Sequence, residues 1–195
     1  MVSRMLNTND IRYLLLEELK NNNVKDAGYD CFNGRQYVEL RNVIFHVDKD
    51  KIFDEVPPLE RMTSQWYEEN YDPILNKNNQ FEKCIKKLRE NPATRQAVII
   101  MGDVNEFDYP VFICTMYMHI FLDSNDDGTY NLEYTVHMRS NDAIEFDTDV
   151  QWHRKIIQQI IEKIKDKYYI KDVNMFWNAD TIHLYSQFWN EIQTK

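Results

Sequence analysis

The chain has 195 residues, the length of one ordinary domain. Hydrophobic residues make up 43% of it and charged residues 28%, which excludes a disordered or low-complexity chain. The formal net charge of −9 disfavours a general nucleic-acid or membrane-surface binder, because phosphate polymers would be repelled. A small anionic ligand would need a local cluster of arginines.

The cysteines are an odd number without a CxxC pair, so they predict neither a disulfide framework nor a zinc site. They are Cys31, Cys84 and Cys114. This usage is typical of a reducing compartment. We find no apolar run of about 18 residues and no signal-peptide pattern, so we expect a cytoplasmic protein that binds neither a membrane nor a metal.

The first half of the chain predicts helices with one strand among them, because apolar residues recur at helical spacing on both sides of a β-rich run. In chain order these are a helix over 10–21, a strand over Tyr37–Val47, a helix over Leu59–Asn70 that Pro73 ends, and a helix with Phe81 and Leu88 on its apolar face that stops at Asn91–Pro92.

The second half predicts more strands. They are a buried strand over Ala97–Met101, a hairpin of Val111–Leu122 and Tyr130–Met138, a helix over Trp152–Lys165 and a final helix starting near Asp180. Because helices and strands are interspersed, with a hairpin among them, the sequence predicts an α+β fold with a mixed sheet, in a single domain over 1–195.

The hairpin turn resembles the start of a calcium loop, since Asp123, Asn125 and Asp127 alternate before Gly128. Such a loop needs a bidentate glutamate at its twelfth position, which here is Tyr134. We therefore interpret the segment as a polar turn.

Three segments carry groups with chemical potential, although each has a structural alternative. Cys114 lies within the apolar run FICTM, where a cysteine is more often a small core residue than a nucleophile. The segment MRSND at Met138–Asp142 carries a guanidinium, a hydroxyl, an amide and a carboxylate, which would suit ligand binding. As a structural alternative, it would be a solvated turn. In IHLYS, His183 and Tyr185 would share one face of a strand, as ligand-binding residues or as structural ones.

Taken together, these segments resemble the thymidylate synthase family, and more closely its phage-type deoxycytidylate hydroxymethylase branch. The resemblance rests on FxCT around Cys114, MRSND, and WNxxxxHxYS at Trp177–Ser186, which occur in that order, and it extends from about Asp10 to Phe188. It implies a three-layer α+β fold on a twisted mixed sheet, a homodimer formed through that sheet, and host cytoplasm if a phage encodes the protein.

The resemblance also implies roles in one-carbon transfer. Cys114 corresponds to the nucleophile that adds to C6 of a pyrimidine, so that C5 attacks the one-carbon unit of 5,10-methylenetetrahydrofolate. Arg139 and Ser140 correspond to groups that bind the nucleotide phosphate, and Arg139 is also a candidate for favouring the thiolate. Arg95 corresponds to an arginine reaching the partner's phosphate, and Arg35 is a third candidate placed only by its position in the early loop.

The sugar and the base are assigned in the same way. His183 and Tyr185 correspond to the pair that binds the 3′-hydroxyl. Asp142 corresponds to a carboxylate of the active-site wall, and its neighbour Asn141 is also taken as substrate-binding. Asp149 corresponds to the residue that reads the base, with Asp147 as a rival because the alignment needs a gap.

An Asp at the base-reading position favours cytosine over uracil. A carboxylic acid can exchange hydrogen bonds with N3 and N4 of cytosine if it carries a proton or shares one with the ring. Buried without a partner such a carboxylate would be costly, so we expect a ligand or a histidine beside Asp149.

Two departures weaken the match. Thr63 stands where the family has a catalytic glutamate, for which Glu60, Glu68 or Glu69 would be substitutes, and the stretch between Trp66 and Gln80, which normally lines the folate pocket, is short. Three hypotheses about the function follow. The protein is a deoxycytidylate hydroxymethyltransferase, a methylating or folate-independent relative acting on dUMP or dCMP, or a nucleotide-binding protein without turnover.

Overall fold

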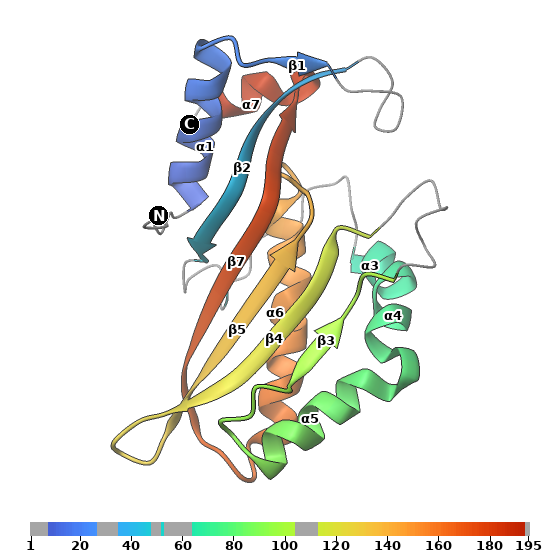
Figure 1. The fold of residues 1–195 in the computed structure, drawn as a ribbon, viewed down its shortest axis with the longest axis vertical. Coiled ribbons are helices and arrows are strands. Elements are labelled where there is room, and N and C mark those ends of the chain that lie inside the picture. Colours follow the sequence, from blue (N-terminus) through green and yellow to red (C-terminus); the bar gives the residue numbers. More distant parts are fainter. Residues whose placement is uncertain (1–7, 27–34, 48–51, 53–63, 104–112, 194–195) are drawn as a thin grey trace.

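A single mixed sheet organises the part of the chain that the computed structural model describes, residues 8–26, 35–47, 52, 64–103 and 113–193. Within these residues the sheet has seven strands, of which six follow the order β1-β2-β7-β5-β4-β3 and the seventh, β6, pairs with β7 (Figure 1). The strands are β1 Lys25–Asp26, β2 Gln36–His46, β3 Val98–Ile100, β4 Thr115–Ser124, β5 Tyr130–Met138, β6 Asn141–Asp142 and β7 Ile170–Tyr185. Strand β7 is antiparallel to β2 and parallel to β5, so the sheet is mixed. The predicted α+β fold on a twisted mixed sheet is confirmed.

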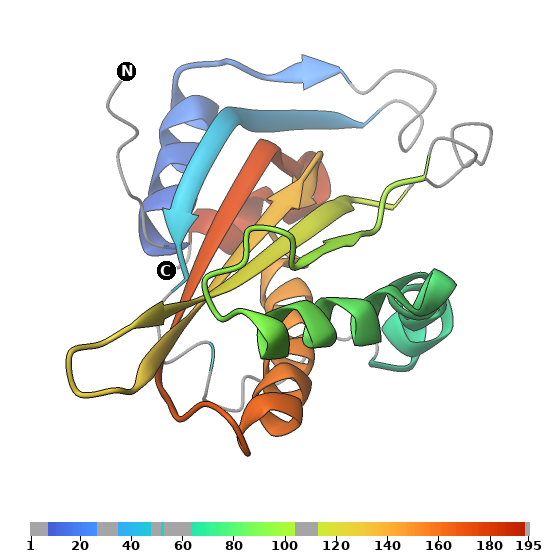
Figure 2. The same cartoon turned by 60° about the horizontal axis from the view of Figure 1, so that its bottom comes forward.

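The helices lie on one face of this sheet (Figure 2). They are α1 Thr8–Lys20, α3 Ser64–Asn70, α4 Asp72–Asn76, α5 Gln80–Glu90, α6 Phe146–Ile164 and α7 Trp189–Gln193, with 3₁₀ turns η1 Lys77–Asn79 and η3 Ser186–Phe188. In Figure 1, α6 runs behind β4 and β5, and no described helix crosses the front of the sheet. None of the described helices is both long enough and apolar enough to span a membrane.

Strict alternation of side chains separates the two faces of the sheet. In β5 the even residues from Leu132 to Met138 are buried against the helices, while Glu133, Thr135 and His137 point the other way and are only partly covered. On α6 the buried stripe matches the period of 3.6, and it ends in Ile160 and Ile164. The core therefore lies between the sheet and α6, and the front of the sheet stays open.

The predicted final helix near Asp180 is wrong, because β7 continues without interruption to Tyr185. Polar residues such as Asn178 and Asp180 suggested a helix start, but they point to the open face, while Ala179 and Ile182 face the core. The described helix at this end begins at Trp189. The length of β7 is set by its pairing with β2 along one side and with β5 and β6 along the other.

Pro73 begins a helix rather than ending one. It lies in the first turn of α4, where a proline costs no hydrogen bond because that N–H would be unpaired in any case. The described part of the helix predicted over Leu59–Asn70 is α3, which ends at Asn70.

Three further boundaries differ from the prediction. The strand at Ala97–Met101 is shorter and lies at the edge of the sheet, so Ile99 is buried but Ile100 is 61% exposed. Helix α6 begins at Phe146 instead of Trp152, which places Asp149 on its first turn. Cys114 precedes β4 and does not lie in mid-strand.

The turn at Asp123–Gly128 is the predicted polar hairpin. Asn125 N–H donates to Thr129 O at 2.8 Å, and Gly128 has a φ of +80°, a backbone conformation that favours glycine. Asp127 accepts hydrogen bonds from Thr129 and Lys171, which lower the pKa of its carboxyl. No group of residues able to hold a metal ion is found among the described residues.

One histidine is part of the core. His153 on α6 is 1% exposed, and its Nδ1 lies 2.9 Å from the hydroxyl of Tyr134. Burial lowers the pKa of His153 to about 3, because an imidazolium in this apolar setting would lose its hydration.

We expect His153 to destabilise the fold in acid. Its folded pKa lies below its unfolded value, so its cost is absent above pH 6.5 and grows as the pH falls from 6.5 toward 3. At pH 5 this amounts to about 2 kcal/mol. In His153→Gln, which keeps an acceptor for Tyr134, the free energy of unfolding from urea titrations should fall less between pH 7 and pH 5. Equal slopes in the two proteins would contradict this.

Candidate active site

The backbone around Cys114 is joined to Arg139 at the mouth of the β4–β5 hairpin. Arg139 N–H donates to Cys114 O at 2.9 Å, and its Nε donates to Ile113 O at 3.1 Å. A register shift between Thr115 and Tyr117 marks a bulge where β4 begins, a feature often found beside active sites. The half-buried thiol-bearing residue and a half-buried guanidinium are thus neighbours, although they are 25 residues apart in sequence.

Tyr71, which the sequence analysis did not single out, belongs to the same site. Its hydroxyl is hydrogen-bonded to the backbone of Cys114 and to the side chain of Thr115. Burial raises the pKa of Tyr71 well above its usual value, and the charges of Asp149 and Cys114 raise it further. Tyr67 and Tyr71 are four residues apart, and their rings lie 4.9 Å apart beside Trp66. That spacing was the available sequence signal.

His183 and Tyr185 share one face of β7, as their spacing predicts. Their ring centroids are 4.8 Å apart. Ser140 Oγ lies 3.2 Å from His183 Nδ1, and Thr181 Oγ1 donates to Ser140 Oγ at 3.3 Å. These contacts connect the segment after β5 to β7 and place Ser140 beside the pair.

Strand β6 brings Asn141 and Asp142 to the same place. It runs parallel to β7, with Asn141 opposite Ile182 and Asp142 opposite His183. Asp142 Oδ1 accepts the N–H of Ile144 at 3.0 Å, which fixes its carboxylate at the turn leading into α6. The MRSND segment therefore runs from the end of β5 through a bend into β6, which is held along β7.

Asp149 is the buried carboxyl of the site. Tyr67 donates to its Oδ1 at 2.5 Å, and Asn141 donates to its Oδ2 at 2.6 Å. Burial raises the pKa of Asp149 to about 7, against the lowering effect of these two hydrogen bonds. Its side-chain partners among the described residues are a tyrosine and an amide rather than a histidine, and a ligand beside it stays a prediction. The rival Asp147 is more exposed and pairs with Arg12 at 3.5 Å.

Glu145, four residues before Asp149, is a second acidic side chain that sequence reasoning did not single out. It is 4% exposed, and its charge raises the pKa of Asp149 and of Tyr67. The residues considered as substitutes for the family's glutamate do not lie at this buried position where the structure describes them. Glu68 and Glu69 are exposed on α3, where they contact Lys155 and Gln65. Thr63 and Glu60 lie outside the described residues.

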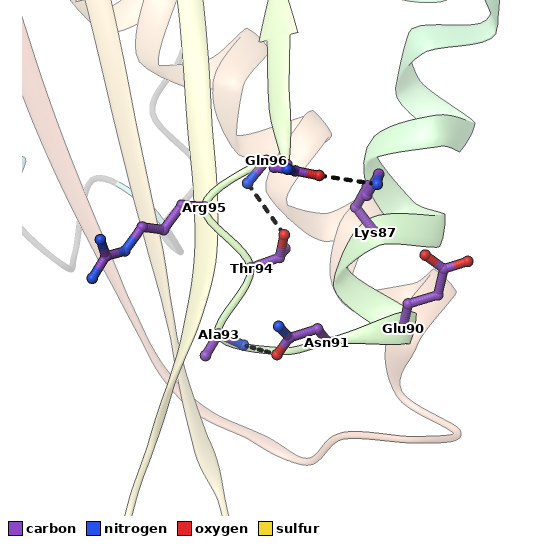
Figure 3. A pocket seen from close by; sticks show the side chains of 7 residues that line it. All are labelled: Lys87, Glu90, Asn91, Ala93, Thr94, Arg95 and Gln96. Carbon is purple, nitrogen blue, oxygen red and sulfur yellow. Dashed lines mark hydrogen bonds between the residues drawn. The ribbon is translucent and has the colours of Figure 1, made fainter.

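The other two predicted arginines lie on other segments of the chain. Arg95 is exposed beside a groove of about 450 Å³ at the end of α5. Figure 3 shows its side chain pointing away from Lys87 and Glu90, which line the same groove. Arg35 is half-buried just before β2, whose residue Tyr37 is paired with Tyr185.

These elements define an α+β domain with a cysteine, an arginine and a buried carboxyl gathered where β4, β5 and α6 meet. No protein-family model matches the sequence, and no curated protein matches it. Among solved structures, the chain is similar to the thermostable thymidylate synthase A from Bacillus subtilis, with a TM-score of 0.62 and 12% identity over 96% of this chain and 83% of that one. The chain therefore has a thymidylate synthase-like fold.

Proposed function

We propose that this protein transfers a one-carbon unit to C5 of a pyrimidine deoxynucleoside monophosphate, converting dCMP into 5-hydroxymethyl-dCMP. The observation that carries the proposal is the meeting of Cys114, Arg139 and Asp149 around Tyr71, within a fold similar to that of a thymidylate synthase. A nucleophile, an anion-binding group and a base-reading group are the three functions that such a transfer needs.

The thiolate of Cys114 would add to C6 of the pyrimidine. As the S–C6 bond forms, the π electron pair of the C5=C6 double bond moves to C5, which becomes a carbon nucleophile. Arg139 beside the Cys114 backbone favours the thiolate and binds the phosphate together with Ser140. His183 and Tyr185 hold the sugar hydroxyl, next to Ser140.

After C5 bonds to the one-carbon unit, C5 would lose its proton to a base and the bond from that carbon to the donor's nitrogen would break, so that tetrahydrofolate leaves and an exocyclic methylene remains on C5. Water then adds to the exocyclic methylene, and the S–C6 bond breaks to restore the C5=C6 double bond. A group that orders this water is required, and Thr63 at the place of the usual glutamate can order water but cannot act as an acid near neutral pH.

Methylenetetrahydrofolate is the proposed donor, and it supplies carbon at the oxidation level of formaldehyde. The half-buried ring of Trp66, whose centroid lies 5.4 Å from that of Tyr71, offers a flat apolar surface of the kind a pterin ring needs. We propose that Trp66 forms the wall against which the donor packs, next to C5 of the bound base.

The direct test is incubation of the protein with methylenetetrahydrofolate and either dCMP or dUMP. A mass gain of one hydroxymethyl group on dCMP supports the proposal. Release of tritium from C5 reports which base is activated, even where no product accumulates. Binding of dCMP by the folded protein without tritium release would defeat the catalytic proposal and leave a nucleotide-binding protein.

We also propose that a second copy of the chain covers the open face of the sheet. Aromatic and histidine side chains line that face, and Tyr117 stacks on His137 with centroids 5.1 Å apart. Ile100 on the edge strand β3 and its partner Tyr117 on β4 are 61% and 39% exposed, and such apolar surface is costly to leave in water. The outward side chain of Arg95 would then be free to reach the partner's phosphate (Figure 3).

We expect light scattering at micromolar concentration to show a dimer, and Phe121→Asp to shift it toward monomer. A charge at this position on the open face would be buried without a partner in the complex. Tyr13→Asp is the matched control, because Tyr13 is 60% exposed on α1 and lies away from that face. A monomeric wild-type protein would refute the dimer and the role of Arg95.

A further inference from the structure

We propose that Tyr67, together with Asn141, is a positioning residue that sets the orientation and the charge of Asp149, and thereby the base that the site accepts. The inference rests on the proposed function in one respect only, the assignment of Asp149 to the base.

Tyr67 and Asn141 act as hydrogen-bond donors that orient Asp149, and Asp149 faces the ligand. Tyr67 and Asn141 each donate one hydrogen bond to Asp149, and they do so to different oxygens, at 2.5 and 2.6 Å. Two donors on two oxygens fix the plane of the carboxyl group. Each oxygen accepts two hydrogen bonds, so one site on each oxygen remains for a ligand.

The exposed fractions of the three side chains indicate that Asp149 contacts the ligand and that Tyr67 and Asn141 lie behind it. Tyr67 and Asn141 are each 2% exposed, whereas Asp149 is 7% exposed. The ring of Tyr67 is held between those of Tyr71 and Trp152, with centroids 4.9 and 6.0 Å away. Tyr67 is therefore rigid and shielded, and it acts on a nucleotide through Asp149.

The charge of Asp149 decides what its free sites recognise. A neutral acid donates one hydrogen bond and accepts another, which matches N3 and N4 of cytosine. An ionised carboxylate only accepts, so it repels an unprotonated N3. Binding of dCMP therefore needs one proton shared between Asp149 and the base.

The groups facing Asp149 come from every element packed around it. They are Tyr67 of α3, Tyr71 before α4, Asn141 and Asp142 of β6, and Glu145 before α6. Burial and the charges of Glu145 and Asp142 favour the neutral acid, while the donors Tyr67 and Asn141 favour the carboxylate. Removing the donor of Tyr67 should move the balance toward the acid.

The experiment follows the carboxyl ¹³C signal of Asp149 against pH in the free protein, assigned by its loss in Asp149→Asn. We expect a midpoint near pH 7 in the wild type. In Tyr67→Phe, which keeps the ring, it should rise by about one pH unit, because a charge-assisted hydrogen bond is lost. Asn141→Ser, which shortens the other donor, should shift it in the same direction.

The dissociation constant of dCMP is then measured from pH 6 to pH 9. In the wild type it should increase about tenfold per unit above the midpoint, and in Tyr67→Phe this increase should begin at higher pH. Tyr134→Phe is the matched control: it removes another buried hydroxyl, bonded to His153, and should leave the profile unchanged.

Equal ¹³C midpoints in the wild type and in Tyr67→Phe would overturn the inference, whatever the nucleotide binding shows. Shifted midpoints in a protein that binds no nucleotide would instead refute the proposed function and leave Tyr67 as the residue that tunes Asp149.

Discussion

Replacing Cys114 by serine should lower turnover by at least about 10³-fold while nucleotide binding persists. A serine hydroxyl has nearly the size of the thiol but is hardly ionised near neutral pH, so it adds to C6 far too slowly. Tritium release from C5 of dCMP measures the loss, since it requires the addition step. Calorimetry with dCMP measures binding, which depends on Arg139, Ser140 and His183 and should change only slightly.

Cys84→Ser is the control for this experiment. Cys84 is buried on α5, and burial raises the pKa of its thiol to about 12, so it is not a nucleophile near neutral pH. The control should retain turnover, with some loss of stability. Full activity of Cys114→Ser would remove the covalent mechanism. Loss of activity in both variants to the same extent would point to damage of the fold.

Replacing Asp149 by asparagine should reverse the preference between the two bases. An amide presents one donor and one acceptor, so with the donor toward O4 and the acceptor toward N3–H it matches uracil, and unlike a carboxylic acid it has no titratable proton to share with N3 of cytosine. One matched pair of hydrogen bonds is worth about 1–3 kcal/mol, so the ratio of kcat/KM for dCMP over dUMP should fall by about 10- to 100-fold.

The same variant changes stability in a predictable direction. Asp149 has a folded pKa above its ordinary value of 3.8, so its contribution to stability is full in acid and is lost as the pH rises through 7. Asp149→Asn should therefore unfold at higher urea concentration than the wild type at pH 8, and show less advantage at pH 5. Asp147→Asn, at the half-buried rival position beside Arg12, should change neither property to a comparable extent, and a base reversal there would move the assignment to Asp147.

The order of the elements could be predicted well where one periodicity was strong. Helix α5 and strand β5 each show one clear pattern, and both lie where the sequence placed them. The errors fall where local signals compete with tertiary pairing. The region near Asp180 has the polar residues of a helix start, but it forms the centre of a strand because β2 and β5 hold it from both sides.

The residues of the candidate site also fall into those that the sequence predicted and those that it did not. Cys114, Arg139 and His183 were chosen for their chemistry and their order in the chain, and the fold brings their segments together. Tyr71 and Glu145 were missed, since a buried tyrosine between two short helices and a glutamate before a helix look structural in the sequence. The four-residue spacing of Tyr67 and Tyr71 was the one local signal for Tyr71, and it is equally typical of an ordinary core face, whereas Glu145 had no such signal.

The residue types, the order of the motifs and the periodicity of each element are properties of the chain itself, and they suffice for the fold class and the candidate nucleophile. Which carboxyl is buried, and which groups set its charge, was decided only by packing. Asp147 and Asp149 differ little in sequence, but helical geometry turns one toward Arg12 and the other into the interior against Tyr67 and Asn141. Desolvation depends on the surroundings in three dimensions, so no pattern along the chain could have supplied it.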